Sequence, residues 1–208
     1  MLNSFDKVYK KIKRKFYTKE PVYDVPEIHI KRADLLEISR KFKDVKIFIE
    51  TGTFFGDTID FFKKHFTKLY SIELSEDLAD KAKKRFQNDT NISIVQGDSS
   101  AQLSKILREI DETCIFWLDG HYSSEFWVGE EFVRTAKGQK NTPVMEELFQ
   151  IINHKVKNHI ILIDDARCFN GDYDYPGIKK IKRLISKHLP SHTFEVENDI
   201  IKIIPGNI

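Results

Sequence analysis

The sequence predicts an α/β fold in which a doubly wound, mostly parallel sheet carries helices on both faces and ends in an antiparallel hairpin. Short apolar runs alternate with amphipathic stretches from residue 45 onward, which is typical of parallel strands joined by helical crossovers. A glycine-rich turn follows the first apolar run. Near the end of the chain, two strand-like segments flank Asn198-Asp199, a pair that favours a hairpin turn.

Each element follows from its own pattern. The apolar runs predict strands at Val45–Glu50, Lys68–Glu73, Asn91–Val95, Thr113–Leu118 and His159–Ile163. Helical periodicity predicts helices at Asp57–His65, Glu76–Gln87, Ala101–Ile110, Pro143–Asn153 and Ile178–His188. The predicted hairpin consists of Thr193–Glu197 and Ile200–Ile204. Residues 120–142 form a long connection, and such connections in a compact domain are more often functional than not.

The 208 residues suffice for one domain with a real core and a small appendage. We expect an N-terminal helical extension at residues 1–44 and a ligand-binding domain at residues 45–208. Apolar residues recur at helical spacing among the basic residues before Pro21. This basic helix could touch an acidic membrane surface or a partner, although packing on the domain is the simpler explanation. A second helix is expected around Ala33–Phe42.

Composition limits the function classes. The formal net charge is +2, so the charge balance predicts no nucleic-acid partner. No apolar run has membrane-spanning length, and no signal-peptide core occurs near the N-terminus. The two cysteines, Cys114 and Cys168, are too few for a disulfide framework and lack the spacing of a zinc site. These features predict a cytoplasmic protein.

The turn "IETGTFFGDT" at residues 49–58 predicts a ligand without phosphate. Gly52 and Gly56 do not have the G-x-G-x-x-G spacing of a dinucleotide site, and the loop holds no lysine that could cradle a phosphate. A G-x-S-x-G nucleophile elbow is also absent. Glu50 at the end of the strand would repel phosphates but would suit an ammonium group. S-adenosylmethionine carries an ammonium, a carboxylate and a sulfonium, and it fits this environment.

Acids at the ends of three successive predicted strands support this ligand. We expect Glu50 to accept from the ammonium group, Glu73 to hold the ribose diol and Asp98 to accept from the adenine amino group. Alternatively, Glu50 is only a loop carboxylate, Glu73 is a solvated strand end, and Asp98 caps the next helix. The complete set of predicted cofactor-binding residues is Glu50, Thr51, Gly52, Gly56, Asp57, Thr58, Glu73, Asp98, Ser99 and Asp119.

A second acidic group follows the fourth and fifth predicted strands. Adjacent strands lie about 4.8 Å apart, so Asp119, Asp164 and Asp165 would face one edge and need a cation or hydrogen-bond donors to offset their repulsion. An all-oxygen set favours Mg²⁺, ahead of Mn²⁺ or Ca²⁺, and such an ion could acidify a substrate hydroxyl. Alternatively, Asp119 orients the cofactor, and Asp164 or Asp165 caps a turn or pairs with Arg167.

Asp119 and His121 are the predicted catalytic residues. His121 is the only histidine beside the acidic group, and an imidazole with a pKa of about 6.5 suits a general base near neutral pH. A histidine that is merely hydrogen-bonded in the loop is the alternative. Aromatic residues of the long connection, including Tyr122, Phe126 and Trp127, could cover a sugar ring, another small polyol or a planar phenol.

At Glu50–Gly56, Glu73 and Gly97-Asp98, the chain resembles the class I S-adenosylmethionine-dependent methyltransferases, over roughly residues 45–204. Phe54 stands where their first motif often has a glycine. One acid after the fourth strand and an acidic pair after the fifth make the chain similar to metal-dependent sugar O-methyltransferases of the macrocin O-methyltransferase type.

The resemblance implies a Rossmann-like fold. It also implies methyl transfer from S-adenosylmethionine to a hydroxyl of a small polar acceptor, such as a sugar or glycoconjugate, assisted by a divalent cation, Mg²⁺ first. A non-catalytic module that binds S-adenosylmethionine or scaffolds a partner is one alternative. A nicotinamide-dependent oxidoreductase is another. RNA methylation has weak support, because no basic patch with interleaved aromatics lines the predicted site.

Overall fold

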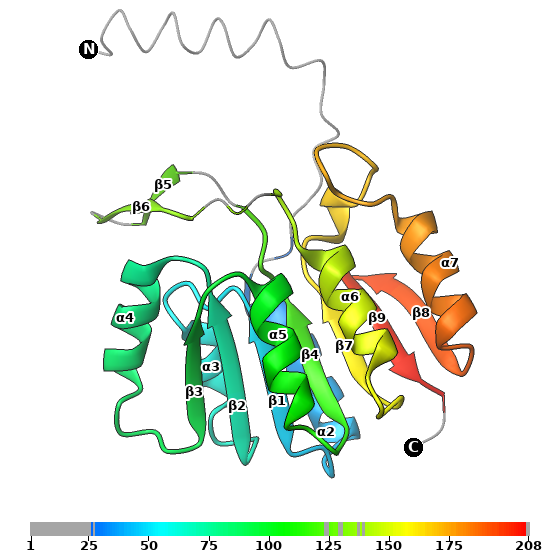
Figure 1. Cartoon of the computed structure of the whole chain (residues 1–208), viewed down its shortest axis with the longest axis horizontal. Coiled ribbons are helices and arrows are strands. Elements are labelled where there is room, and N and C mark those ends of the chain that lie inside the picture. The colour runs from blue at the N-terminus through cyan, green and yellow to red at the C-terminus, as the bar shows by residue number, and fades with distance from the viewer. Residues whose placement is uncertain are drawn as a thin grey trace, which may run out of the picture.

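The structure, a computed structural model, describes residues 26, 28–122, 135, 136, 138 and 140–206, and the backbone of 125–128 and 131–134. A seven-stranded sheet forms its centre, with strand order β3-β2-β1-β4-β7-β9-β8 (Figure 1). The parallel strands are β1 (Ile47–Thr51), β2 (Lys68–Glu73), β3 (Ile92–Gln96), β4 (Cys114–Leu118) and β7 (Ile160–Ile163). The antiparallel pair at one edge is β8 (His192–Glu197) and β9 (Ile200–Pro205). The predicted Rossmann-like sheet with its closing hairpin is therefore confirmed.

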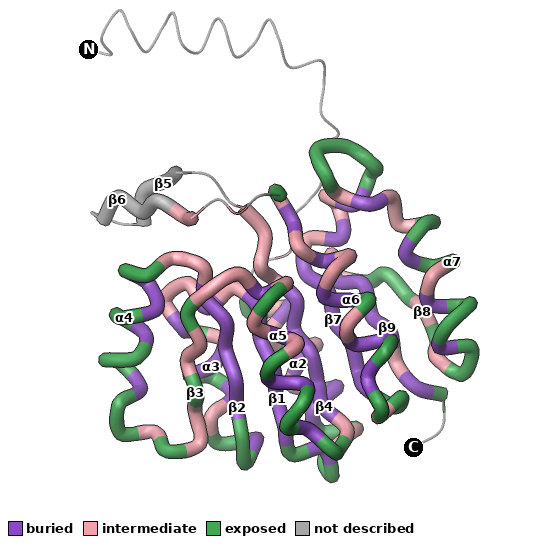
Figure 2. The backbone as a smooth tube through the Cα atoms, viewed as in Figure 1, coloured by how far each residue is buried: buried purple, intermediate pink, exposed green. Residues whose placement is uncertain are grey.

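Helices cover both faces of the sheet, as predicted. One core cluster joins the strands to α5 (Ser99–Arg108), α6 (Val144–Asn153) and α7 (Ile178–His188). The other joins them to α2 (Ile28–Lys41), α3 (Asp57–Phe62) and α4 (Glu76–Arg85). Strand β1 shows why both faces are apolar: Ile47 and Ile49 belong to the first cluster, and Phe48 between them belongs to the second. Figure 2 shows the resulting buried centre and exposed outer helix surfaces.

Element bounds differ from the predicted ones by a few residues. Helix α3 ends at Phe62 rather than His65, and α5 begins at Ser99 because Asp98 caps it. Helix α2 begins at Ile28, five residues before the predicted start. The predicted basic helix in residues 1–25 lies outside the described residues. In the part of the chain that the structure describes, no helix is long and apolar enough to cross a membrane.

The long connection contains regular structure that the sequence did not predict. Within residues 120–142, β5 (Glu125–Val128) and β6 (Glu131–Arg134) pair antiparallel as a separate two-stranded sheet. Figure 1 shows this hairpin beyond the carboxyl ends of the parallel strands, above α4.

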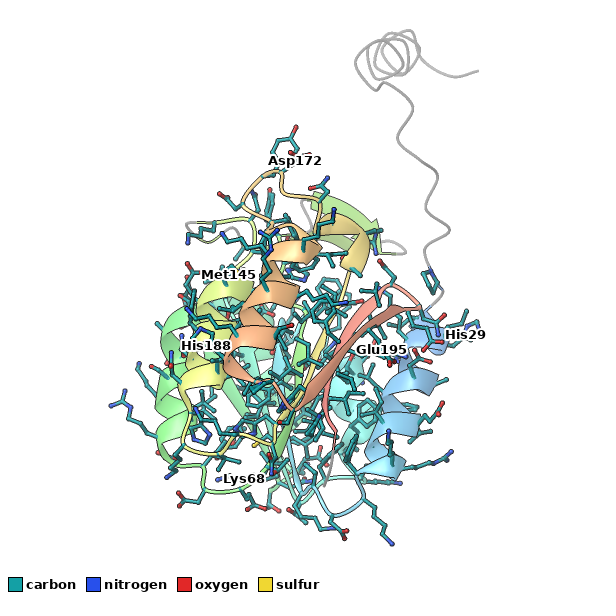
Figure 3. All side chains as sticks on the ribbon, turned by 90° about the vertical axis from the view of Figure 1, so that its right-hand side faces the viewer. His29, Lys68, Met145, Asp172, His188 and Glu195 are labelled. Atoms are coloured by element: carbon teal, nitrogen blue, oxygen red, sulfur yellow. The ribbon has the colours of Figure 1, made fainter. Side chains whose placement is uncertain are left out.

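The backbone ladder gathers the residues that follow the parallel strands at one edge. Gly52 N donates to Ile72 O over 2.9 Å, and Asp119 N donates to Thr51 O over 3.0 Å. Asp164 N donates to Leu118 O over 3.0 Å. Figure 3 labels Asp172 in the loop beyond this edge and Lys68 at the opposite end of the molecule. The carboxyl ends of β1, β2, β4 and β7 therefore present their following residues together.

Candidate functional site

A cavity of about 400 Å³ opens at the carboxyl ends of the parallel strands, within the usual range of roughly 300–1,000 Å³ for small-molecule sites. Six of the predicted site residues line it: Gly52, Glu73, Asp98, Ser99, Asp119 and His121. Further lining residues include Phe54, Leu74, Leu78, Gly97, Gly120, Tyr122, Thr135, Ala136, Gly138, Lys140 and Glu146. The structure thus brings acids from three strand ends to one hollow.

The glycine-rich turn forms one wall because its backbone takes left-handed conformations. Gly52 has φ +86°, and a Cβ there would collide with the backbone carbonyl of Asp119. Gly56 has φ +81° and precedes the first residue of α3. Phe54 also lies in the left-handed region, with φ +50°, although this conformation normally disfavours a side chain. The structure holds it there through a hydrogen bond from Phe54 N to Glu73.

Glu73 ties the turn to the end of β2. Its Oε2 accepts from Phe54 N over 2.8 Å, and its Oε1 accepts from Ser75 N over 2.9 Å. The residue is only 6% exposed, and this burial raises the pKa of the carboxyl while the backbone donors oppose the rise. The backbone of Thr53 and of Leu74 makes smaller contributions to the same carboxylate, and Glu73 also lines the cavity.

With S-adenosylhomocysteine as the ligand that the sequence predicts, replacing Glu73 by Gln should weaken its binding about 10- to 100-fold. Gln keeps one acceptor oxygen but loses the charge, and hydrogen bonds to charged groups contribute about 1.5–3 kcal/mol. Isothermal titration of the wild type and Glu73→Gln measures the change. Glu76→Gln is the matched control, because Glu76 lies exposed in the first turn of α4. Equal affinities of the wild type and Glu73→Gln would mean that Glu73 only supports the turn.

Glu50 lies behind the turn rather than in the cavity wall. It is 1% exposed, and its Oε2 accepts from the Ser71 hydroxyl over 2.5 Å. Ser71 in turn contacts Thr53 Oγ1 at 2.6 Å. Burial raises the pKa of Glu50 to about 8, against the hydrogen bond from Ser71. The predicted contact of Glu50 with an ammonium group stays a prediction.

Four other predicted cofactor residues also lie outside the cavity lining. Gly56, Asp57 and Thr58 stand at the start of α3, where Asp57 pairs with Arg85 at 2.7 Å on the surface. Thr58 hydrogen-bonds Glu50, and Thr51 is fully buried at the end of β1. These residues shape the turn from behind, and their direct contact with a ligand stays a prediction.

Asp98 caps helix α5, which is the alternative role that the sequence offered for it, and it also lines the cavity. Its Oδ1 accepts from Ser100 N over 2.8 Å and so caps α5, while the residue lines the hollow beside Ser99. A cap occupies one carboxylate oxygen, so capping and ligand binding are compatible here.

Asp119, Gly120 and His121 follow one another in the sequence, and all three line the cavity. Burial, followed by the charges of Asp164 and Asp165, raises the pKa of Asp119 well above its ordinary value. Burial lowers the pKa of His121 to about 4. The His121 ring is held by Thr142 Oγ1, 3.0 Å from Nδ1, and by the backbone of Asp164. His121 is therefore neutral and fixed in the loop at neutral pH.

The acidic group beside this wall differs from the predicted one. The carboxylates with ligand oxygens within 4.8 Å of one another are Asp164, Asp165 and Asp199, not Asp119, Asp164 and Asp165. Both adjacent aspartates reach the group because β7 has ended at Ile163 and Asp165 turns into the left-handed region, with φ +54°. Asp199 comes from the β8–β9 turn.

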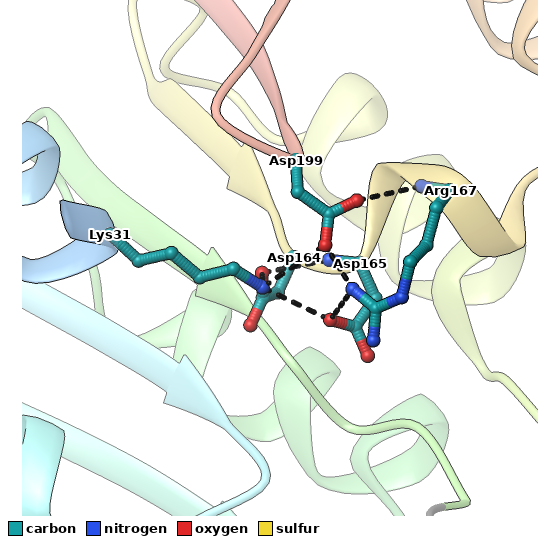
Figure 4. Close-up of polar contacts among 5 residues, drawn as sticks. All are labelled: Lys31, Asp164, Asp165, Arg167 and Asp199. Carbon is teal, nitrogen blue, oxygen red and sulfur yellow. Dashed lines mark hydrogen bonds and ion pairs between the residues drawn. The ribbon is translucent and has the colours of Figure 1, made fainter. Parts of the chain in front are cut away.

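Two basic side chains, Lys31 and Arg167, contact this group, as Figure 4 shows. Lys31 Nζ contacts Asp164 Oδ1 and lies 3.1 Å from Asp165 Oδ1 and 3.3 Å from Asp199 Oδ2. Arg167 bonds Asp165 Oδ1 over 2.7 Å and also contacts Asp199. Burial opposes the charged form of Lys31, but the aspartates outweigh it and raise the pKa of its ammonium. The donor set therefore does not fit a divalent cation, which would have to displace Lys31.

Sequence reasoning missed three residues of this region. Lys31 lies in the segment expected to be an extension, and Asp199 was read only as a turn residue. Glu147 on α6 is 1% exposed, and burial raises its pKa to about 7; a Cβ on Gly120 would lie 3.6 Å from its Oε1. No local signal marks these positions, because each acquires its role through a distant contact.

Comparison with solved structures identifies the fold. An O-methyltransferase from Bacillus cereus in complex with S-adenosylhomocysteine (SAH) aligns with a TM-score of 0.58 at 14% identity, over 98% of this chain and 92% of that one. The SAH-bound methyltransferase PaMTH1 of Podospora anserina gives 0.59 at 12% identity, over 99% and 89%. An rRNA methylase from Streptococcus thermophilus gives 0.53 at 17% identity, over 92% and 99%.

No protein-family description and no curated protein matches the sequence. The structural neighbours differ in the acceptors that their names imply, so the likeness concerns architecture. The chain has the Rossmann-like fold of the S-adenosylmethionine-dependent methyltransferases.

Proposed function

We propose that this chain transfers the methyl group of S-adenosylmethionine to a hydroxyl oxygen of a small polar acceptor, such as a sugar. The carrying observation is the cavity itself: Glu73, Asp98 and Asp119 line one hollow at successive strand ends, and the turn beside it lacks a phosphate-binding pattern. Such an acidic wall suits a cationic ligand and disfavours a dinucleotide.

The residues have distinct tasks in this proposal. Glu73 accepts from the ribose hydroxyls, and Asp98 accepts from the adenine amino group. The sulfonium supplies an electrophilic methyl group, so the protein mainly aligns donor and acceptor for in-line transfer. In this proposal Asp119 receives the proton of the acceptor hydroxyl, because it is the carboxyl group that lines the cavity beside His121. His121 is a neutral ring in this proposal, and its contact with Thr142 holds this part of the cavity wall in place.

The acceptor side is proposed from a second hollow that shares Lys140 and Glu146 with the first. Phe149 and Tyr175 give it aromatic surface, while Asp174 and Lys180 give it charged groups. Aromatic faces beside polar groups suit a sugar ring, which offers apolar C–H faces and hydroxyl edges. The sequence also suggested a divalent cation, but Lys31 and Arg167 already serve the carboxylates, so no step of this mechanism uses a metal.

The ligand preference provides the test of this function. We expect titration to show binding of S-adenosylmethionine and SAH, and weak or no binding of NAD, because the carboxylate wall repels a pyrophosphate. Preference for NAD would overturn the proposal in favour of an oxidoreductase.

Transfer of a labelled methyl group separates an enzyme from a binding module. A panel of glycosides, a catechol and a short RNA should show labelling of a glycoside. Labelling of the catechol or the RNA alone would reassign the acceptor. Tight cofactor binding without labelling of any acceptor would support the non-catalytic module.

A further inference from the structure

The cluster around Lys31 is built from three separate segments of the chain. Lys31 comes from α2, Asp164 and Asp165 follow β7, Arg167 belongs to the short 3₁₀ helix η1 (Ala166–Cys168), and Asp199 comes from the β8–β9 turn. The side chains of Lys31, Asp164 and Asp199 are only 6%, 8% and 8% exposed. An ion pair this well shielded from water is strongly coupled, and removing one partner leaves an uncompensated buried charge.

Helix α2 is fastened to the same hairpin by a second, oppositely arranged contact. Asp34, one turn after Lys31, accepts from Lys202 Nζ over 2.7 Å and from Asn198 Nδ2 over 3.1 Å. Residues three apart share a face of a helix, so α2 presents one positive and one negative group to the hairpin. This pairing places the Lys31 ammonium among the three aspartates.

We propose that the ammonium of Lys31 is the permanent cation of this acidic cluster, standing in for a divalent ion. Three carboxylates whose ligand atoms lie within 4.8 Å of one another resemble the oxygen set that a hard cation binds. In this chain Lys31 is the cation that forms ion pairs with all three carboxylates, while Arg167 pairs with Asp165 and Asp199. The inference concerns the cluster itself and holds whichever acceptor is methylated.

Replacing Lys31 by an uncharged residue should have a specific consequence. If the ammonium does the work of an ion, removing it should convert the cluster into a metal site, because the three carboxylates stay in place and Arg167 still pairs with two of them. Lys31→Met keeps the length of the apolar stem and removes the charge. Lys202→Met is the matched control: Lys202 is similarly buried, at 9% side-chain exposure, and bonds Asp34 and Glu197, outside the three-carboxylate group.

Thermal unfolding in EDTA and in 1 mM Mn²⁺ tests the claim on the full chain, without cofactor. Lys31→Met should be destabilised in EDTA and should gain about 5 °C in melting temperature with Mn²⁺, as expected for an ion that binds only the folded state. The wild type and Lys202→Met should shift by less than about 1 °C. Loss of the free Mn²⁺ signal in electron paramagnetic resonance should show binding to Lys31→Met alone.

Each other outcome contradicts the proposal. Binding of Mn²⁺ to the wild type with a rise in melting temperature would show that the aspartates take a metal despite Lys31. Equal responses of Lys31→Met and Lys202→Met would show that the ion acts elsewhere. Lys31→Gln, which can still donate to one carboxylate, is the second variant if Lys31→Met does not fold. Failure of both variants to fold, with or without Mn²⁺, would show that a divalent ion cannot replace the ammonium.

Discussion

Replacing Gly52 by Ala should lower the affinity for S-adenosylhomocysteine by more than about 100-fold. The expected loss has two causes. A left-handed backbone costs a residue with a Cβ about 1–2 kcal/mol, and the new Cβ at Gly52 would collide with the carbonyl of Asp119. The Cβ and the Asp119 carbonyl are both fixed to the backbone, so the turn and the end of β4 must move apart. Each 1.4 kcal/mol of binding free energy lost in this way is a tenfold loss of affinity.

A substitution at a second glycine, Gly171, distinguishes the effect of backbone strain from the effect of the atomic collision. Gly171 also has a positive φ, +103°, but no heavy atom lies within 4 Å of the Cβ that a substitution would add. Gly171→Ala should therefore lose some stability and keep its cofactor affinity. Titration and chemical denaturation of both variants measure the two quantities. Normal SAH binding by a folded Gly52→Ala would show that the approach of the turn to Asp119 is not needed.

The fold was predictable because its signals are local. The central parallel strands β1, β4 and β7 are buried along their whole length, so they read as nearly continuous apolar runs, as in Ile47-Phe48-Ile49. Helix α7 is amphipathic enough that its predicted and observed bounds agree at Ile178–His188. The hairpin turn is marked by Asn198 and Asp199, which both adopt positive φ. The β5–β6 hairpin was missed because the segment was judged by length and aromatic content alone.

The candidate site was predictable only where a residue directly follows a strand. Glu73, Asp98 and Asp119 reach the cavity because parallel strands end at the same edge, a rule that needs no tertiary detail. Lys31 and Asp164 are 133 residues apart in sequence, and no periodicity or motif connects them. The prediction that close carboxylates need a cation was physically sound, but sequence alone could not identify that cation as a lysine of the chain.

Lowering the pH from about 6.5 to about 3 should remove on the order of 4 kcal/mol of stability through His159, since each unit of pKa shift is worth about 1.4 kcal/mol. His159 directly precedes β7 and is 1% exposed. Its Nδ1 accepts from the backbone N–H of Cys114 over 3.1 Å, so a neutral ring carries its proton on Nε2, which donates to His154 Nδ1 over 2.8 Å. His154 then donates from Nε2 to Leu107 O over 2.9 Å.

Protonation of His159 breaks this relay, because Nδ1 can no longer accept from Cys114. Burial, with the neighbouring His154, His192 and Lys157, lowers the pKa of His159 to about 3. The unfolded chain takes up this proton near pH 6.5 and the folded chain does not. The contribution is therefore complete above pH 6.5 and is lost as the pH falls toward 3. Glu50 and Glu147, with raised pKa values, have the opposite slope, so total stability alone cannot isolate His159.

The difference between the wild type and His159→Asn isolates it. Asn can accept from Cys114 but cannot titrate, so the variant should be less stable at pH 7.5, and its deficit should shrink by about 1.4 kcal/mol per pH unit below 6.5. Urea denaturation at several pH values gives the two free energies of unfolding. His188→Asn, at the exposed end of α7, should show no such trend. A deficit that stays constant from pH 7.5 to pH 4.5 would mean that His159 is protonated equally in the folded and unfolded chains, and that the buried relay does not depend on its neutral form.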